Sequence, residues 1–218
     1  MGIAPARYTL DVAEILAFFG GTFDPVHCGH LIIARHVVEQ ARLDRLTFVP
    51  AGVPPHKEAA HSAAKHRMAM LKLAVAGHGE LDVSDIELSR PGRSFTYDTL
   101  RALRERHPGD RLLWLIGLDI LEDLPRWYRA AALVREFEFL VAMRPPGGPL
   151  LESARSALRE AFGVRAARRL TANVLTTPLI EISSTTIRAR VANGLPIDWL
   201  TPPPVARYVR KHGLYRAP

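Results

Sequence analysis

A short apolar run that ends in two glycines and leads into an amphipathic helix is the feature that most restricts the fold of this 218-residue chain. The run at residues 15–19 predicts a buried strand, and Gly20 and Gly21 permit its exit turn because neither carries a Cβ atom. Apolar residues then recur at helical spacing and predict a helix over residues 29–42. The chain therefore opens with a strand, a glycine loop and a helix.

The same alternation continues to the C-terminus. The predicted elements are strands at 45–50, 111–116, 136–143 and 173–176, an extended segment at 81–88, and helices at 62–76, 96–106, 151–162 and 183–192. Strands that alternate with helices predict an α/β fold: a doubly wound, mostly parallel Rossmann-like sheet with helices on both faces, here with a small C-terminal helical region. We expect one domain at 15–218, with 1–14 as a disordered N-terminal extension or an overextended start.

The composition bounds the class of protein. With 48% hydrophobic residues, the chain can bury one sizeable core. Its one cysteine, Cys28, excludes an intrachain disulfide and fits a reducing cytoplasm. No uninterrupted apolar stretch reaches the ~18 residues of a membrane helix. We expect a cytoplasmic protein without a membrane partner, either a monomer or a homo-oligomer.

The net charge of +7 raises the question of a nucleic-acid partner. Most of the basic residues are arginines spread along the chain. One loose cluster comprises Arg155, Arg159, Arg165, Arg168 and Arg169. This dispersed pattern is more typical of a solvated surface than of a binding stripe, so we expect no nucleic acid and keep that partner as a minor alternative.

Ligands of doubly wound sheets bind outside the carboxyl ends of the strands. The loops at 21–30, 51–57 and 117–127, and the turn that enters the helix at Ser183, are therefore the candidate site.

The first loop, GGTFDPVHCGH, combines features of an anion site. It is neither a Walker A sequence nor G-x-G-x-x-G. It offers a close approach of the backbone, the hydroxyl of Thr22 and the imidazoles of His27 and His30, so that N–H groups, a helix dipole and two potential cations would surround one anion. A zinc site at His27, Cys28 and His30 is a weaker alternative, because adjacent residues point apart and no second ligand cluster follows.

This loop resembles the signature of the bacterial nicotinate-mononucleotide adenylyltransferases, within the HxGH nucleotidyltransferase superfamily. Further segments resemble the motifs of that family in order: VPPHK at 53–57, SFTYDTL at 94–100, LIGLD at 115–119 with Trp127, RP at 144–145, ISSTTIR at 182–188, and the tail at 200–215. The resemblance runs from about residue 15 to residue 216.

The resemblance implies that the chain transfers AMP from ATP to nicotinate mononucleotide, giving deamido-NAD and pyrophosphate. The attack would be in line and without a covalent enzyme intermediate, with Mg²⁺ carried mainly by the ATP phosphates. The catalytic residues it implies are His27, His30 and Arg188. The ATP-binding residues are Gly20, Gly21, Thr22, Phe23, His27, His30, Lys57, Ser183, Ser184, Thr185 and Arg188.

Residues that follow later strands are expected to bind the acceptor. Trp127 offers an aromatic face to the pyridine ring, Asp119 can accept from a ribose hydroxyl, and Thr96 with the backbone N–H of Tyr97 can receive the nicotinate carboxylate. The loop at 51–53 lacks the asparagine that many family members carry, and Leu118 stands where small or polar residues are common. Nicotinamide mononucleotide therefore stays open as the acceptor. A non-catalytic module that senses ATP or binds nucleic acid is the alternative from another class.

Overall fold

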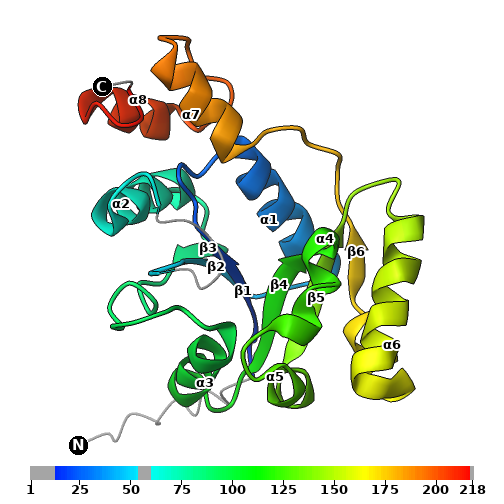
Figure 1. Cartoon of the computed structure of the whole chain (residues 1–218). Helices are drawn as coiled ribbons and strands as arrows, with labels where there is room; N and C mark the ends of the chain where they lie inside the picture. The colour runs from blue at the N-terminus through cyan, green and yellow to red at the C-terminus, as the bar shows by residue number, and fades with distance from the viewer. Residues whose placement is uncertain (1–12, 54–59, 217–218) are drawn as a thin grey trace, which may run out of the picture.

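Six parallel strands form one sheet in the computed structural model, which describes residues 13–53 and 60–216 (Figure 1). The sheet order is β3-β2-β1-β4-β5-β6. The strands are β1 (Ile15–Gly21), β2 (Arg45–Pro50), β3 (Leu81–Val83), β4 (Arg111–Gly117), β5 (Glu138–Met143) and β6 (Val174–Thr176). The strand order reverses between β1 and β4, which is where a ligand crevice forms in sheets of this kind.

Helices cover both faces of the sheet. They are α1 (Cys28–Ala41), α2 (Ala64–Val75), α3 (Thr96–Arg106), α4 (Leu118–Leu121), the 3₁₀ turn η1 (Leu124–Arg126), α5 (Ala130–Glu136), α6 (Gly148–Leu170), α7 (Ser184–Ala192) and α8 (Pro203–Lys211). Alternate residues of β4 separate the two cores: Trp114 packs in the core with α3 to α6, whereas Leu113 and Leu115 pack in the core with α1, α2, α7 and α8. The predicted doubly wound α/β fold is confirmed.

The bounds of the predicted elements agree best where the periodic pattern is strong. The strand at 45–50 and the helix at 96–106 have the predicted bounds. The segment at 81–88 is a strand only over Leu81–Val83, because the chain turns at Asp85, whose carbonyl accepts from the N–H of Ser89. The strand predicted from residue 136 begins at Glu138, since Glu136 ends α5.

Helix α6 is longer than predicted. The predicted segment 151–162 ends at Gly163, where φ is 81° and the helical conformation breaks. A second helical stretch then continues the element to Leu170. The local pattern therefore found the break but not the continuation. The short elements α4, η1 and α5 were not predicted, whereas the C-terminal helical region is present as α7 and α8.

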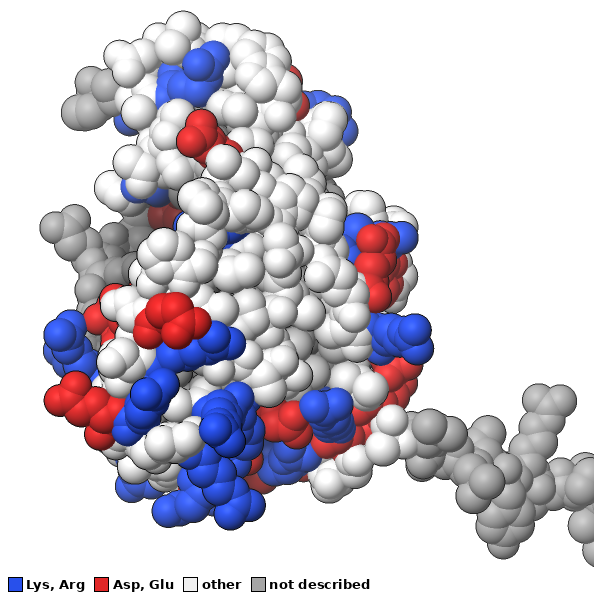
Figure 2. Space-filling model, turned by 90° about the vertical axis from the view of Figure 1, so that its right-hand side faces the viewer, with Lys and Arg blue, Asp and Glu red and all other residues white. Residues whose placement is uncertain are grey.

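Figure 2 shows the face of the molecule that includes α6, where Lys and Arg side chains gather toward the lower end with Asp and Glu among them. Two exposed ion pairs join arginines to acids: Arg111 with Glu138 and Arg155 with Glu152, both at 2.6 Å. Exposed pairs of this kind stabilise a fold by at most about 1 kcal/mol each. Part of the predicted arginine cluster is therefore balanced by nearby acids.

The N-terminal side of the sheet is fixed just before β1. Glu14, which the sequence assigns to the extension, donates its N–H to Asp110 Oδ1 at 3.0 Å, and its carbonyl accepts from Arg111. Residues 1–12 lie outside the described residues. Within the described ranges, no helix is both long and apolar enough to span a bilayer.

Candidate active site

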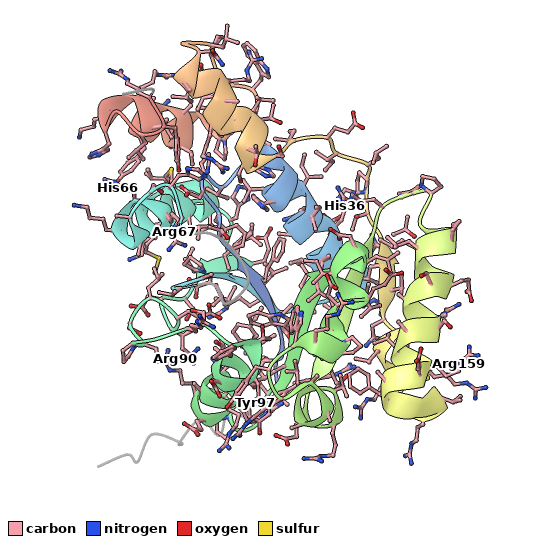
Figure 3. All side chains as sticks on the ribbon, viewed as in Figure 1. His36, His66, Arg67, Arg90, Tyr97 and Arg159 are labelled. Atoms are coloured by element: carbon pink, nitrogen blue, oxygen red, sulfur yellow. The ribbon has the colours of Figure 1, made fainter. Side chains whose placement is uncertain are left out.

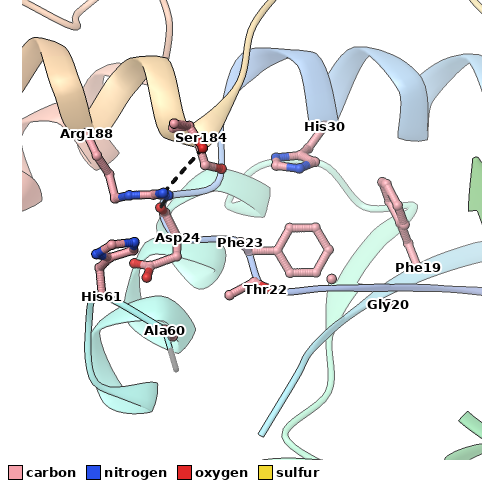
Figure 4. Close-up of a pocket in the computed structure, with 12 residues that line it drawn as sticks. Phe19, Gly20, Thr22, Phe23, Asp24, His30, Ala60, His61, Ser184 and Arg188 are labelled. Atoms are coloured by element: carbon pink, nitrogen blue, oxygen red, sulfur yellow. Dashed lines mark hydrogen bonds between the residues drawn. The ribbon is translucent and has the colours of Figure 1, made fainter. Parts of the chain in front are cut away.

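A cavity of about 500 Å³ lies at the carboxyl end of β1, where the sequence predicts the site (Figure 4). Its lining comes from the first loop, from the residues before α2 and from the N-terminal turn of α7. The lining residues are Phe19, Gly20, Gly21, Thr22, Phe23, Asp24, His30, Ala60, His61, Ser184, Thr185 and Arg188. We call this the first pocket. Most of the residues predicted to bind ATP line it.

Neighbouring side chains require both glycines of the first loop. A Cβ on Gly20 would lie 2.3 Å from the ring of Trp114, and one on Gly21 would lie 2.8 Å from the ring of Phe23. Phe23 itself has a positive φ of 51° and packs edge-on against Phe19 and His30. Gly21 thus leaves room for the ring of Phe23 in the wall of the first pocket, and Gly20 leaves room for Trp114, which does not line that pocket.

The two histidines of the loop are stacked, with ring centroids 3.6 Å apart. The backbone N–H of His27 donates to Nδ1 of His30 at 3.2 Å, which places the proton of the neutral His30 ring on Nε2. His30 lines the first pocket, whereas His27 is buried behind it. The structure therefore presents the Nε2–H of His30 as a hydrogen-bond donor.

Burial decides the charge of both rings. It lowers the pKa of His27 to about 4, and burial followed by the proximity of His27 holds the pKa of His30 well below its usual value. Both imidazoles are therefore neutral at neutral pH in this structure. Burial in the packed loop thus disfavours the charged forms of the two imidazoles, which the sequence offers as potential cations.

Helix α7 contributes a cation to the first pocket. Arg188 donates from Nη1 to the carbonyl of Asp24 at 2.9 Å and from Nη2 to Oγ1 of Thr185 at 3.3 Å. The hydroxyl of Ser184 donates to the carbonyl of Pro25 at 2.8 Å. Ser183 instead caps the helix by accepting from the N–H of Thr186, and it does not line the pocket.

Three residues of the first pocket and its underside received no role from the sequence. Asp24 is quoted within the first motif, yet only the structure shows that its carboxylate is buried. His61 lines the pocket on the same side as Asp24 and Arg188 (Figure 4). Arg67 of α2, labelled in Figure 3, is 2% exposed and donates to the carbonyl of Thr22 at 3.0 Å. No local pattern distinguishes such residues from surface ones.

A smaller pocket of about 150 Å³ lies on the other side of β1 and shares Phe19, Gly20 and Gly21 with the first. We call it the second pocket. Of the residues predicted to bind the acceptor, Thr96 and Trp127 line it. The other lining residues are Ala51, Glu87, Ser94, Trp114, Leu115, Ile116, Gly117 and Ile120.

The other two predicted acceptor residues do not line the second pocket. The side chain of Tyr97 is buried in the core beside Phe137, and its hydroxyl donates to Glu136 at 3.2 Å, so only its backbone remains available for a ligand. Asp119 is exposed, with a carboxylate oxygen 3.9 Å from Arg144. Lys57 lies outside the described residues.

Glu87 is a buried acid in the wall of the second pocket. It accepts a hydrogen bond from Thr99 at 2.8 Å, and burial raises the pKa of its carboxyl group. Ser94 accepts from the N–H of Gly52 at 3.0 Å, and a Cβ on Gly52 would lie 2.6 Å from the carbonyl oxygen of Glu87. The loop that lacks the expected asparagine is thus held by its backbone.

The zinc alternative concerns His27, Cys28 and His30 of the first loop. Across residues 13–53 and 60–216, no group of three or more His, Cys, Asp or Glu side chains could hold a metal ion. The stacking of the two imidazoles and the use of His30 Nδ1 as an acceptor explain why the loop does not form such a group.

Comparison with known proteins adds to this geometry. The model of the cytidylyltransferase-like family matches residues 18–190. A probable nicotinate-nucleotide adenylyltransferase of Synechococcus sp. is 42% identical over 204 residues, which cover 93% of this chain and 95% of the relative. The chain belongs to the nicotinate-nucleotide adenylyltransferase family. It is a nucleotidyltransferase of NAD biosynthesis.

Other members of the nicotinate-nucleotide adenylyltransferase family are similar over nearly their whole length. A probable enzyme of this name from Neisseria meningitidis is 40% identical over 92% of this chain and 98% of its own. The solved structure of the Plasmodium falciparum nicotinic acid mononucleotide adenylyltransferase complexed with NaAD has a TM-score of 0.71. It covers 93% of this chain and 97% of its own at 20% identity, and this likeness supports the fold.

Proposed function

We propose that this chain transfers AMP from ATP to nicotinate mononucleotide, giving nicotinate adenine dinucleotide and pyrophosphate. The observation that carries the proposal is the pair of pockets that share Gly20 and Gly21 at the carboxyl end of β1. The first pocket has the donors suited to a polyphosphate, and the second has an aromatic wall and a helix N-terminus. Two nucleotides bound in this way would bring their phosphates together above the glycines.

The reaction we propose is a single in-line displacement. A phosphate oxygen of the mononucleotide attacks the α-phosphorus of ATP and forms the new P–O bond, while the bond from that phosphorus to the bridging oxygen breaks and pyrophosphate leaves. Such transfer depends on positioning and charge neutralisation, so no enzyme nucleophile is required.

Each donor of the first pocket has a specific part in this proposal. Arg188 supplies a fixed positive charge, and Ser184 and Thr185 open the positive end of α7. The Nε2–H of His30 donates to a phosphate oxygen, and His27 holds the ring of His30 in that orientation through its backbone N–H. A bound polyphosphate would raise the pKa of both imidazoles, because an anion stabilises their charged forms.

Among the described residues, Asp24 is the acid that lines the first pocket, and both of its carboxylate oxygens accept hydrogen bonds from Ser62 or Tyr215. We therefore propose that Mg²⁺ binds ATP phosphates and water, neutralising charge at the transferring group without a cage of protein ligands. The residues of this chain then orient the phosphates that carry it.

The direct test measures pyrophosphate release with purified protein, Mg²⁺ and ATP, with and without nicotinate mononucleotide. We expect release only when both substrates are present. Folded protein that releases no pyrophosphate under these conditions would contradict the proposal.

Nicotinamide mononucleotide is the second candidate acceptor, and Glu87 is the observation that favours it. A buried carboxylate in the second pocket could accept a hydrogen bond from the carboxamide of that substrate. A comparison of kcat/KM for the two mononucleotides separates the candidates. Preference for the acid form supports the first, and preference for the amide supports the second.

A further inference from the structure

The carboxylate of Asp24 connects three distant segments of the chain beneath the first pocket. It is 2% exposed and accepts hydrogen bonds from the backbone N–H of Ser62 at 3.0 Å and from the hydroxyl of Ser62 at 2.5 Å. It also accepts from the hydroxyl of Tyr215, 191 positions away, at 2.5 Å. The first loop is therefore attached both to the start of α2 and to the C-terminal segment.

The main chain of the same loop holds the arginines of the site. The carbonyl of Asp24 accepts from Nη1 of Arg188, and the carbonyl of Thr22 accepts from Nη1 of the buried Arg67. The position of the Arg188 guanidinium in the first pocket thus depends on where the backbone of Asp24 lies. Whatever fixes the Asp24 side chain also fixes this carbonyl.

Tyr215 adopts a conformation that its neighbours must maintain. Its φ is 64°, a left-handed value that is uncommon for a residue with a bulky side chain, and it lies at the end of the turn that follows α8. Burial and the adjacent Asp24 raise the pKa of its hydroxyl, so the group remains a hydrogen-bond donor over the working pH range. The Tyr215 hydroxyl bonds to Asp24 of the first loop and lies 3.3 Å from the hydroxyl of Ser62, so an uncommon backbone conformation is combined with contacts beneath the site, which indicates a positional role.

We infer that Tyr215 is a positioning residue whose hydroxyl, through Asp24, holds Arg188 toward the ATP phosphates. This inference rests on the proposed function for its catalytic consequence, but its effect on ATP binding can be measured without an acceptor. It assigns to the C-terminal segment a part in the use of ATP, although none of the described residues after Arg188 lines the first pocket.

The test compares Tyr215→Phe with Tyr208→Phe as the matched control. Both substitutions remove one tyrosine hydroxyl from the C-terminal segment, but that of Tyr208 is bonded to His66 at 3.0 Å and not to the first loop. We expect Tyr215→Phe to raise the Kd for ATP and lower kcat/KM for ATP by about tenfold, because a displacement near 1 Å can reduce rates by up to about 100-fold. The KM for nicotinate mononucleotide should change by less than about twofold, and Tyr208→Phe should leave the three constants unchanged.

A double-mutant cycle decides whether the effect passes through Arg188. In an Arg188→Ala background, Tyr215→Phe should no longer change the Kd for ATP, because the group it positions is absent. An undiminished effect in that background, or wild-type ATP binding by Tyr215→Phe, would overturn the inference. Calorimetric titration with ATP alone provides the Kd and needs no acceptor. If the wild-type protein binds ATP but releases no pyrophosphate, the proposed function is refuted, while the role of Tyr215 in ATP binding can still be tested.

Discussion

The first and second pockets share a wall but are constructed differently. The first pocket is surrounded by hydrogen bonds that join its loop to α2, to α7 and to the C-terminal segment. The second is lined mainly by strand ends, two tryptophans and the start of α3. The difference indicates that hydrogen bonds to distant segments fix the first pocket, whereas the second combines the packing of rings with hydrogen bonds of Glu87 and Ser94 in its wall.

Among the substitutions that distinguish the two pockets, His30→Ala in the first pocket is expected to have the largest effect on kcat. Loss of one donor to the transferring phosphates should lower kcat by about 10²–10³-fold, with little change in the KM for the mononucleotide. His36→Ala is the matched control, since His36 lies on the same helix, bonds to the carbonyl of Ile32 and is not among the described residues that line either pocket. Near-normal turnover of His30→Ala would remove this ring from the mechanism.

A second effect concerns the pH dependence of stability. The folded protein holds the pKa of His27 at about 4 against an ordinary value of 6.5, so only the unfolded chain binds this proton between these values. The contribution of His27 to the free energy of unfolding should therefore be fully present above pH 6.5. It should fall as the pH drops toward 4, by up to about 3 kcal/mol in total.

Urea denaturation from pH 4 to pH 7 measures this slope. His27→Gln should show a shallower dependence than the wild-type protein, and His36→Gln should retain the wild-type dependence. If His27→Gln shows the full slope, then the burial of this ring does not govern acid stability.

A substitution in the wall that the two pockets share, at Gly20, should affect the binding of both substrates. Gly20→Ala would place a methyl group 2.3 Å from the ring of Trp114, and overpacking of this kind costs about 1–3 kcal/mol. We expect a lower Tm and an increase in KM for both substrates, because the displaced tryptophan belongs to the second pocket and the glycine to both. Gly79→Ala is the control, since a Cβ there meets no atom within 4 Å. An unchanged Tm would show that the wall can adapt.

The smallest effect is expected from Trp127→Ala. Loss of stacking worth about 0.5–1.5 kcal/mol should raise the KM for the mononucleotide by roughly two- to tenfold while the KM for ATP stays constant. Trp199→Ala provides the comparison, because Trp199 is 64% exposed and lines neither pocket. If Trp127→Ala raises the KM for ATP as much as the KM for the mononucleotide, then the two substrates do not bind in separate pockets.

Much of the fold could be predicted because its signals are local. The apolar run before Gly20 and the periodic helix after it are present within about thirty residues, and their alternation with later elements gives the parallel sheet. The periodic pattern was misleading at Gly163, where a glycine indicates the end of a helix. The chain instead continues as α6 to Leu170.

The sequence by itself determined which groups meet at the carboxyl end of β1: the Gly20–Gly21 turn, His30, Thr96, Trp127 and Arg188 line the two pockets there. Only the tertiary structure decided their state. The neutrality of His27 and His30 depends on how deeply the loop is buried, and the tie from Asp24 to Tyr215 joins residues that no local pattern relates. Desolvation and long-range hydrogen bonds arise from packing, and packing is not a property of any short segment.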